Sequence, residues 1–553
     1  MRERIAVSGI IAALAFAAGC AHRPPAAQPA GPAPLFTGLG HFHHAVATSS
    51  PEAQRYFDQG LTLAFAFNHA EAERSFRYAA QLDATCAMCW WGVAFVLGPN
   101  INVPMDPAAA APAWEALQKA QALAAGTTPQ ERGYIEALAT RYAQAPPADR
   151  APLDQAFATA SGNLSRQFPD DLDAAALYAE ALMDLHPWDY YDHDGQPKRA
   201  STRAIVSTLE SVLKRDNSHA WAMHLYIHAT EASDHPERAE AFADKLGPMF
   251  PAAGHLVHMP AHTYMRVGRY HDAMAANERA TAADDSYVAQ CHAQGAYPIG
   301  YVPHNHHFLT AAAGFAGNSE QALHAATDTQ SHVVHELLRE PGIGGMLQGF
   351  EVQPLYAMVR FGKWQQILDT PAPPKDLAFP TALWHYARGR AYTGLGRVSD
   401  ASSELAVLTA IAASPDIAKV GSVGLNPASS VLQVAIEALT GELEAKRGNA
   451  EAAIHHLEAG VKLEDNLAYS EPPDWNYPVR QSLGAVLLAA GKAREADLVY
   501  REDLRRNPLN GWSLFGLVQS LGAQGRKGEA AVAKEKFDKA WQWADVTLVA
   551  SRF

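Results

Sequence analysis

Basic residues, cysteines and long apolar runs are all scarce in this sequence of 553 residues. It has 44 Lys and Arg against 58 Asp and Glu, a formal net charge of −14. That balance argues against nucleic acid as the main partner, because binding a phosphate backbone needs a basic surface. Beyond the N-terminal segment, no stretch is apolar over the length needed to span a bilayer. Runs of β-branched residues are few and alanine is abundant, which favours helices.

Two common catalytic signatures are missing as well. The sequence has no His-Glu-x-x-His, so a zincin protease is not indicated, and no Gly-rich phosphate loop of the Walker type. Only four cysteines occur. Cys86 and Cys89 form a close pair, which fits a disulfide or buried structural pair, with a redox or metal role as the alternative. Attachment of a c-type haem needs His after the second cysteine, and Trp90 stands there instead.

The first 19 residues have the pattern of a signal peptide. Two arginines precede an apolar stretch, residues 5–18, that is too short to span a bilayer comfortably. The Ala-Ala-Gly-Cys that ends at Cys20 resembles the lipobox of bacterial lipoproteins, although Ala17 replaces the usual Leu; an ordinary secretory signal is the alternative. The Pro/Ala-rich composition of residues 20–40 is typical of an extended tether. We therefore expect a lipid on Cys20 to anchor the protein in the cell envelope, facing the periplasm. Ala21, which follows the cysteine, favours the outer membrane over the inner.

A period of 34 residues organises the rest of the chain. The turn Gly-Lys-Ala-Arg-Glu-Ala at residues 491–496 returns as Gly-Arg-Lys-Gly-Glu-Ala at residues 525–530. Related turns begin at Gly268, Gly396 and Gly448. Each Gly is expected to end a helix in a left-handed cap, and the small Ala lets two helices approach closely. These features predict a series of helical hairpins.

The pattern resembles the tetratricopeptide repeat (TPR) over most of residues 53–541. The resemblance implies an all-α, right-handed superhelical solenoid whose concave groove holds a protein or peptide. We assign residues 41–170 to N-terminal repeats with an insert, 171–345 to central His-rich repeats and 346–553 to C-terminal repeats. Interruptions of the array are expected at residues 98–170, 185–200, 285–302 and 370–380.

The repeat register predicts which side chains face the groove. Positions 2, 5, 9 and 12 of the first helix in each repeat resemble the groove positions of the TPR family. Repeats that start at Ala220, Gly254 and Pro303 then place seven side chains that can bind a metal on the groove: His224, His228, Glu231, His258, His262, His304 and His307.

Two of the histidine pairs have the spacing of a chelating site. His224/His228 and His258/His262 are each four residues apart, on one face of a helix, and the pairs are 34 residues apart. Such a set suits a transition metal such as Zn, Cu or Fe, with Glu231 as a ligand or a general base. The alternatives are ordinary hydrogen-bonded histidines, or protonated ones that recognise a carboxylate or phosphate.

Two further segments carry histidines. Residues 41–44, His-Phe-His-His, could cap the groove, bind a metal with Cys86 and Cys89, or have no role. Residues 186–193 are dense in aromatic and acidic side chains, and are interpreted either as a loop folded over the groove or as a rigid packed loop.

Two functional hypotheses follow. In the first, the protein is a lipid-anchored scaffold whose groove binds a protein or peptide, and a His-rich metal site lies in its centre. In the second, the solenoid is a rigid frame for a metal-dependent enzyme, hydrolytic or oxidative. The partner, the metal and the substrate do not follow from the sequence.

Overall fold

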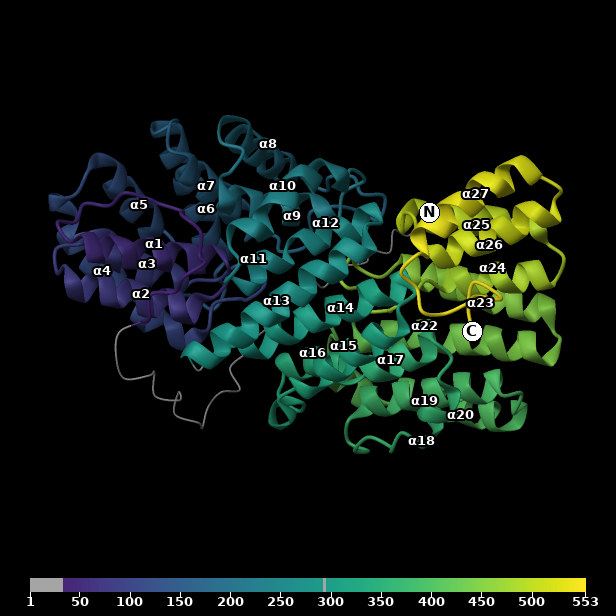
Figure 1. Ribbon diagram of the computed structural model, residues 1–553. Coiled ribbons are helices and arrows are strands. Elements are labelled where there is room, and N and C mark those ends of the chain that lie inside the picture. The colour runs from purple at the N-terminus through teal and green to yellow at the C-terminus, as the bar shows by residue number, and fades with distance from the viewer. Residues whose placement is uncertain (1–32, 292–294) are drawn as a thin grey trace, which may run out of the picture.

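The computed structural model describes residues 33–291 and 295–553 (Figure 1). The predicted signal peptide, Cys20 and most of the tether lie outside these ranges. Within them, no helix combines the length and the apolar character that crossing a membrane requires.

The described residues form an array of helical hairpins with no β-strand, apart from two isolated bridges, Tyr191 with Pro197 and Ser422 with Pro427. The predicted all-α solenoid of TPR-type hairpins is confirmed. The N-terminal helices are α1 (Pro51–Phe65), α2 (His69–Leu82), α3 (Ala87–Val96), α4 (Ala110–Leu123), α5 (Pro129–Ala139), α6 (Ala151–Gln167), α7 (Leu172–Met183) and α8 (Ala200–Arg215).

The central helices surround the histidines. They are α9 (Ala220–Glu231), α10 (Glu240–Met249), α11 (Gly254–His258), α12 (Pro260–Val267), α13 (Tyr270–Cys291), α14 (Val302–Ala316), α15 (Ser319–Ser331), α16 (Ile343–Glu351) and α17 (Gln353–Arg360). A π-helical turn, η4 (Tyr297–Tyr301), leads into α14. Short 3₁₀ turns are η1 (Pro107–Ala109), η2 (Ala124–Gly126), η3 (Pro236–Ala239) and η5 (His335–Leu337).

The C-terminal helices continue the same pattern. They are α18 (Trp364–Asp369), α19 (Ala378–Gly394), α20 (Val398–Ala412), α21 (Pro415–Val420), α22 (Ala428–Arg447), α23 (Ala450–Asp465), α24 (Val479–Ala489), α25 (Ala493–Arg506), α26 (Gly511–Ala523) and α27 (Lys527–Ala540). The segment between α23 and α24, residues 466–478, is a long loop that returns to the central histidines.

Left-handed glycines end the first helix of hairpins, as the repeat pattern predicts. Six of them have φ between 72° and 84°: Gly268, Gly317, Gly396, Gly448, Gly491 and Gly525. The predicted first residues of two repeats are also confirmed, since α9 begins at Ala220 and α11 at Gly254. The third repeat begins one residue early, because α14 starts at Val302.

The predicted insert at residues 98–170 is mostly helical, and it carries α4, α5 and α6. These helices are not preceded by the glycine turn of the repeat, and α5 begins with a different sequence pattern. Thr128 and Glu131 form a capping box before α5, with Pro129 at the first helical position. The array therefore continues through this region.

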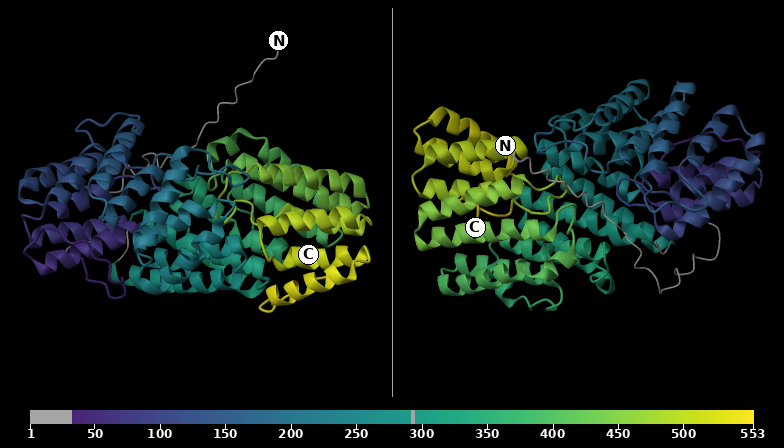
Figure 2. Two further views of the ribbon diagram at one scale, coloured as in Figure 1. Left: turned by 90° about the horizontal axis from the view of Figure 1, so that it is seen from above. Right: turned by 180° about the vertical axis from the view of Figure 1, so that it is seen from behind.

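The molecule is elongated, with the N-terminal and C-terminal repeats at opposite ends and the central helices between them (Figures 1 and 2). The C-terminal repeats fold back onto the centre. The indole Nε1 of Trp512 on α26 donates to the Gly314 carbonyl of α14 at 3.0 Å, and the Tyr270 hydroxyl donates to the Pro508 carbonyl at 2.9 Å. This return brings the 466–478 loop against α12, where Glu471 lies beside His262 and Tyr469 beside Arg266.

Candidate metal centre

Histidines from four helices meet in the interior of the central repeats. His224 and His228 lie on α9, His255 and His258 on α11, and His262 on α12. These five side chains and Glu231 are at most 2% exposed. His304, on α14, is partly buried beside them. The histidines are therefore buried among the central helices.

The ligand atoms of these residues form three groups, and within each group they lie within 4.8 Å of one another. The first group is His224, His228 and His255, and the second is His258, His262 and His304. The third is His228, Glu231 and His262, so Glu231 stands between the other two groups. The two histidine triads share no residue.

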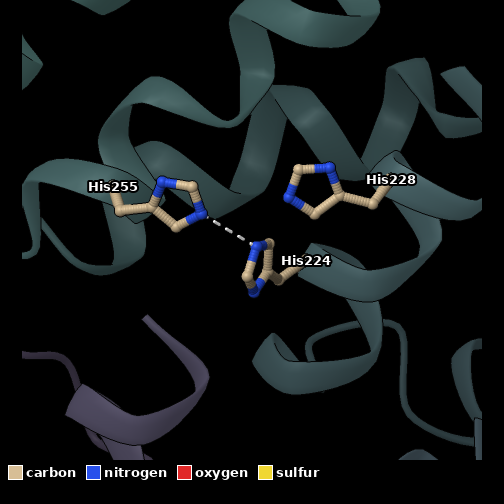
Figure 3. Close-up of side chains that lie close together, drawn as sticks. All are labelled: His224, His228 and His255. Atoms are coloured by element: carbon tan, nitrogen blue, oxygen red, sulfur yellow. Dashed lines mark hydrogen bonds between the residues drawn. The ribbon is translucent and has the colours of Figure 1, made fainter. Parts of the chain in front are cut away.

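The rings of the first triad face one another, as Figure 3 shows. The Nε2 atoms of His224 and His255 are 3.1 Å apart. His228 points its Nδ1 at Glu231 Oε1, at 3.1 Å, and its Nε2 has no hydrogen-bond partner among the described residues. A carboxylate can only accept, so the proton of His228 is on Nδ1 and its Nε2 lone pair is free.

In the second triad, Asn277 fixes the tautomer of His258. The Asn277 amide nitrogen donates to the Ala273 carbonyl at 2.8 Å, so its Oδ1 is the atom that faces His258 Nδ1, at 2.7 Å. That oxygen requires a proton on Nδ1. His258 Nε2 is therefore a lone pair, and it lies 2.9 Å from Nε2 of His262.

Two carboxylates orient His262 from its other side. Its Nδ1 lies 2.5 Å from Glu231 Oε2 and 3.3 Å from Glu471 Oε2. Glu471 comes from the 466–478 loop and also accepts from the Tyr469 hydroxyl. Both carboxylates accept a hydrogen bond, so the proton of a neutral His262 is on Nδ1. Its Nε2 then has a lone pair that points at His258.

Burial makes most of these imidazoles neutral. It lowers the pKa of His224, His228, His255, His258 and His304 well below 6.5, and neighbouring histidines lower it further. Burial lowers the pKa of His307 to about 3. For His262 burial acts in the same direction, but Glu231 and Glu471 outweigh it and raise its pKa to about 9. Neutral imidazoles are the form that binds a metal.

Six of the seven residues predicted from the register lie in the three groups. His307 does not: its ring packs against Phe350, with ring centres 5.8 Å apart. His255 is not among the predicted residues, although the repeat that starts at Gly254 puts it at groove position 2. Glu471 is not among them either, and the sequence around residues 466–478 carries no signal for it.

The other predicted segments lie apart from the triads or at their edge. Cys86 and Cys89 are joined in a disulfide, so they supply no thiolate to residues 41–44. Within that segment, His44 Nδ1 pairs with Asp173 at 2.6 Å. In the 186–193 loop, the Trp188 ring packs edge-on against His228, with centres 5.2 Å apart, so this loop does cover α9.

No protein-family model and no curated protein matches this sequence. Solved structures with a similar course include human IFIT1 with m7Gppp-AAAA (13% identity, 91% of this chain and 92% of that chain, TM-score 0.32). Others are the APC/C Cut9–Hcn1 hetero-tetramer (12% identity, 88% and 76%, TM-score 0.31) and the P58(IPK) TPR domain (12% identity, 86% and 99%, TM-score 0.23). The fold of this chain is defined by its own helical hairpins and turns.

Proposed function

We propose that this protein is an exported, lipid-anchored TPR protein that binds transition-metal ions in its central repeats, one ion in each histidine triad. The facing Nε2 atoms of His258 and His262 carry this proposal. With both Nδ1 protons fixed, the two Nε2 atoms, 2.9 Å apart, need a proton or a metal ion between them. The raised pKa of His262 supplies that proton in the metal-free protein, and a metal ion would replace it. Nitrogen ligands about 2.05 Å from a tetrahedral ion are roughly 3.3 Å apart, close to this spacing.

The surroundings of the triads support a metal over an ordinary hydrogen-bond network. Ligating histidines usually donate their second N–H to a carboxylate or carbonyl, as His228 does to Glu231 and His258 to Asn277. Glu231 places one oxygen on His228 and the other on His262, so it orients ligands of both triads. An imidazole-rich set of this kind suits Zn, Cu or Fe.

A titration of metal-free protein with Zn²⁺, or with Co²⁺ for its visible spectrum, tests the proposal. We expect about two equivalents to bind, one for each triad. The double variant His228→Ala/His262→Ala removes one ligand from each triad and should lose both. Its matched control, His271→Ala/His455→Ala, changes two exposed histidines and should bind as the wild type does. Wild-type protein that takes up no metal, or a ligand variant that binds normally, would refute the proposal.

The location is proposed from the N-terminal sequence alone. The lipobox-like residues before Cys20 and the Pro/Ala-rich tether support an anchor in the outer membrane, with the helical array in the periplasm. Labelled fatty acid should be incorporated into the wild type but not into Cys20→Ser. Equal incorporation in the two proteins would refute the lipid anchor.

A further inference from the structure

A cavity of about 180 Å³ lies directly beside the two triads. Histidines line one side of it: His228, His255, His262, His304 and His307. His307, which belongs to neither triad, thus lies on the wall of the cavity beside them. Any molecule in the cavity would contact the same imidazoles that are proposed to hold the metal.

Much of the remaining wall is apolar or aromatic. It includes Trp188, Met346, Phe350, Tyr356, Phe379 and Leu425. Among the described residues, no lysine or arginine lines the cavity. An anionic group against these apolar side chains would have no lysine or arginine to pair with, and burying an unpaired charge is costly.

Two amide side chains on the cavity wall already have partners. Gln353 accepts from Asn476 at 2.6 Å and donates to the Gly349 carbonyl at 2.9 Å. Asn102 accepts from the Trp188 indole and donates to the Tyr301 hydroxyl, both at 3.2 Å. Atoms on the cavity wall without a hydrogen-bond partner include His228 Nε2 and His307 Nε2, and also the Tyr356 hydroxyl. A metal ion on the histidine side would decide which of these atoms a ligand's polar group faces.

We propose that this cavity binds a neutral, single-ring aromatic molecule, such as a phenol, with its polar group toward the histidines. An apolar cavity of about 150 Å³ is known to take up benzene, so the size fits one ring. The apolar walls hold the ring, and the absence of lysine and arginine from them disfavours a carboxylate at its far end. The orientation of the polar group rests on the proposed metal centre, whereas the fit of the ring does not.

A second cavity, of about 700 Å³, adjoins the first and offers a route to it. Five residues line both cavities: Trp188, Ser470, Glu471, Pro472 and Asp474. The wall between them thus consists of the 186–193 loop and the 466–478 loop.

Gly300 offers a way to fill the inner cavity without disturbing the fold. It lines the cavity, and a Cβ built on it would meet only Met346 Cε, at 4.0 Å. Gly300→Leu should therefore place its side chain in the cavity. The matched control is Gly522→Leu, on α26, where a Cβ meets nothing within 4 Å and no part of the cavity is touched.

The experiment measures binding of p-cresol by calorimetry to wild type, Gly300→Leu and Gly522→Leu, each metal-free and loaded with Zn²⁺. We expect p-cresol to bind the wild type and Gly522→Leu, and to bind Gly300→Leu at least about tenfold more weakly. Zn²⁺ stoichiometry of Gly300→Leu should equal that of the wild type, which shows that the variant is folded. In Co²⁺-loaded wild type, p-cresol should change the visible spectrum.

The second probe is 4-hydroxybenzoate, which adds a carboxylate at the far end of the same ring and should bind metal-free protein at least about tenfold more weakly than p-cresol. The inference is overturned if p-cresol does not bind, if it binds Gly300→Leu equally well, or if 4-hydroxybenzoate binds as tightly. If p-cresol binds as expected but no form takes up metal, the ring site stands and the proposed metal centre fails. If metal binds and p-cresol does not, the metal centre stands and the ring site fails.

Discussion

Asn277 lies outside the triads, yet it decides which nitrogen of His258 is free for a metal. It is fully buried, and its amide is held by the Ala273 carbonyl. Without its Oδ1, the proton of His258 can move to Nε2, where it competes with the metal. The proposed metal centre therefore depends on a residue that is not itself a candidate ligand.

We expect Asn277→Leu to weaken Zn²⁺ affinity by about 10- to 100-fold without changing the stoichiometry, because partners of ligating histidines usually contribute that much. Competition with a chromophoric chelator measures the affinity. Asn277→Asp keeps an acceptor oxygen at the position and should stay closer to the wild type. Equal affinities for the Leu variant and the wild type would show that Asn277 does not set the tautomer.

His44 and Asp173 form a partly buried pair where the N-terminal segment packs on α7. Burial alone would lower the pKa of His44, but its bond to Asp173, with smaller contributions from Asp171 and Asp58, raises it above 6.5. Burial opposes ionisation of Asp173 too, yet its two histidine partners, His219 and His44, lower its pKa to about 2.

The signs of these shifts fix a pH window for stability. The contribution of His44 is complete below pH 6.5 and is lost as the pH rises through its raised pKa. The contribution of Asp173 is complete above pH 3.8 and is lost as the pH falls toward 2. The pair is therefore fully stabilising between these limits.

We expect His44→Gln to lower the unfolding free energy by about 2 kcal/mol at pH 5.5 and by much less at pH 9. Urea denaturation at the two pH values measures the difference. His43→Gln is the control, since the His43 side chain is 58% exposed and should change stability little at either pH. A deficit for His44→Gln that is the same at both pH values would contradict the ionic interpretation.

At the scale of elements, α11 is short but positions two of the candidate ligands, His255 and His258. It spans only Gly254–His258, and its first residue is pressed against Asp284 of α13. Asp284 is fixed in turn by the Tyr297 hydroxyl at 2.8 Å and by the Asn305 amide at 2.7 Å. Helices α11, α13 and α14 are therefore joined behind the triads by one buried carboxyl, whose pKa burial raises to about 7.

Gly254→Ala should destabilise the protein by about 1–3 kcal/mol, because the new Cβ would lie 1.9 Å from Asp284 Oδ1. Thermal unfolding measures this change. Gly314→Ala, on the neighbouring α14, is the control: a Cβ there meets nothing within 4 Å, so the variant should be as stable as the wild type or more so. If the two variants unfold at the same temperature, the close approach at Gly254 is not limiting.

The sequence predicts the elements well where local chemistry determines them. Left-handed glycines such as Gly268 and Gly317 mark the hairpin turns, and the start of α9 follows from the register. His255 could also have been predicted, since the same register places it at a groove position. Glu471 was not, because its contact with His262 depends on small rotations between many successive repeats, which no single turn encodes.

At the scale of the whole molecule, a contact between distant repeats completes the surroundings of the proposed metal centre. Trp512 on α26 is fully buried, donates to the Gly314 carbonyl, and lies under the guanidinium of Arg360, 3.8 Å from its ring centre. This contact holds the C-terminal repeats against α14. The same return of the chain carries the 466–478 loop, with Glu471, to His262.

Trp512→Ala should therefore loosen the C-terminal repeats and weaken the centre together. Truncating a buried Trp costs about 3–5 kcal/mol, and we expect cleavage within residues 466–478 in limited proteolysis to become faster. Zn²⁺ affinity should fall by about tenfold, as it should in Glu471→Gln, because His262 loses one of its two carboxylates in each case. Trp543→Ala is the control, since Trp543 is 53% exposed. If Trp512→Ala opens the loop to protease while Zn²⁺ affinity is unchanged, Glu471 does not support the metal centre, and the histidine triads depend on the central repeats alone.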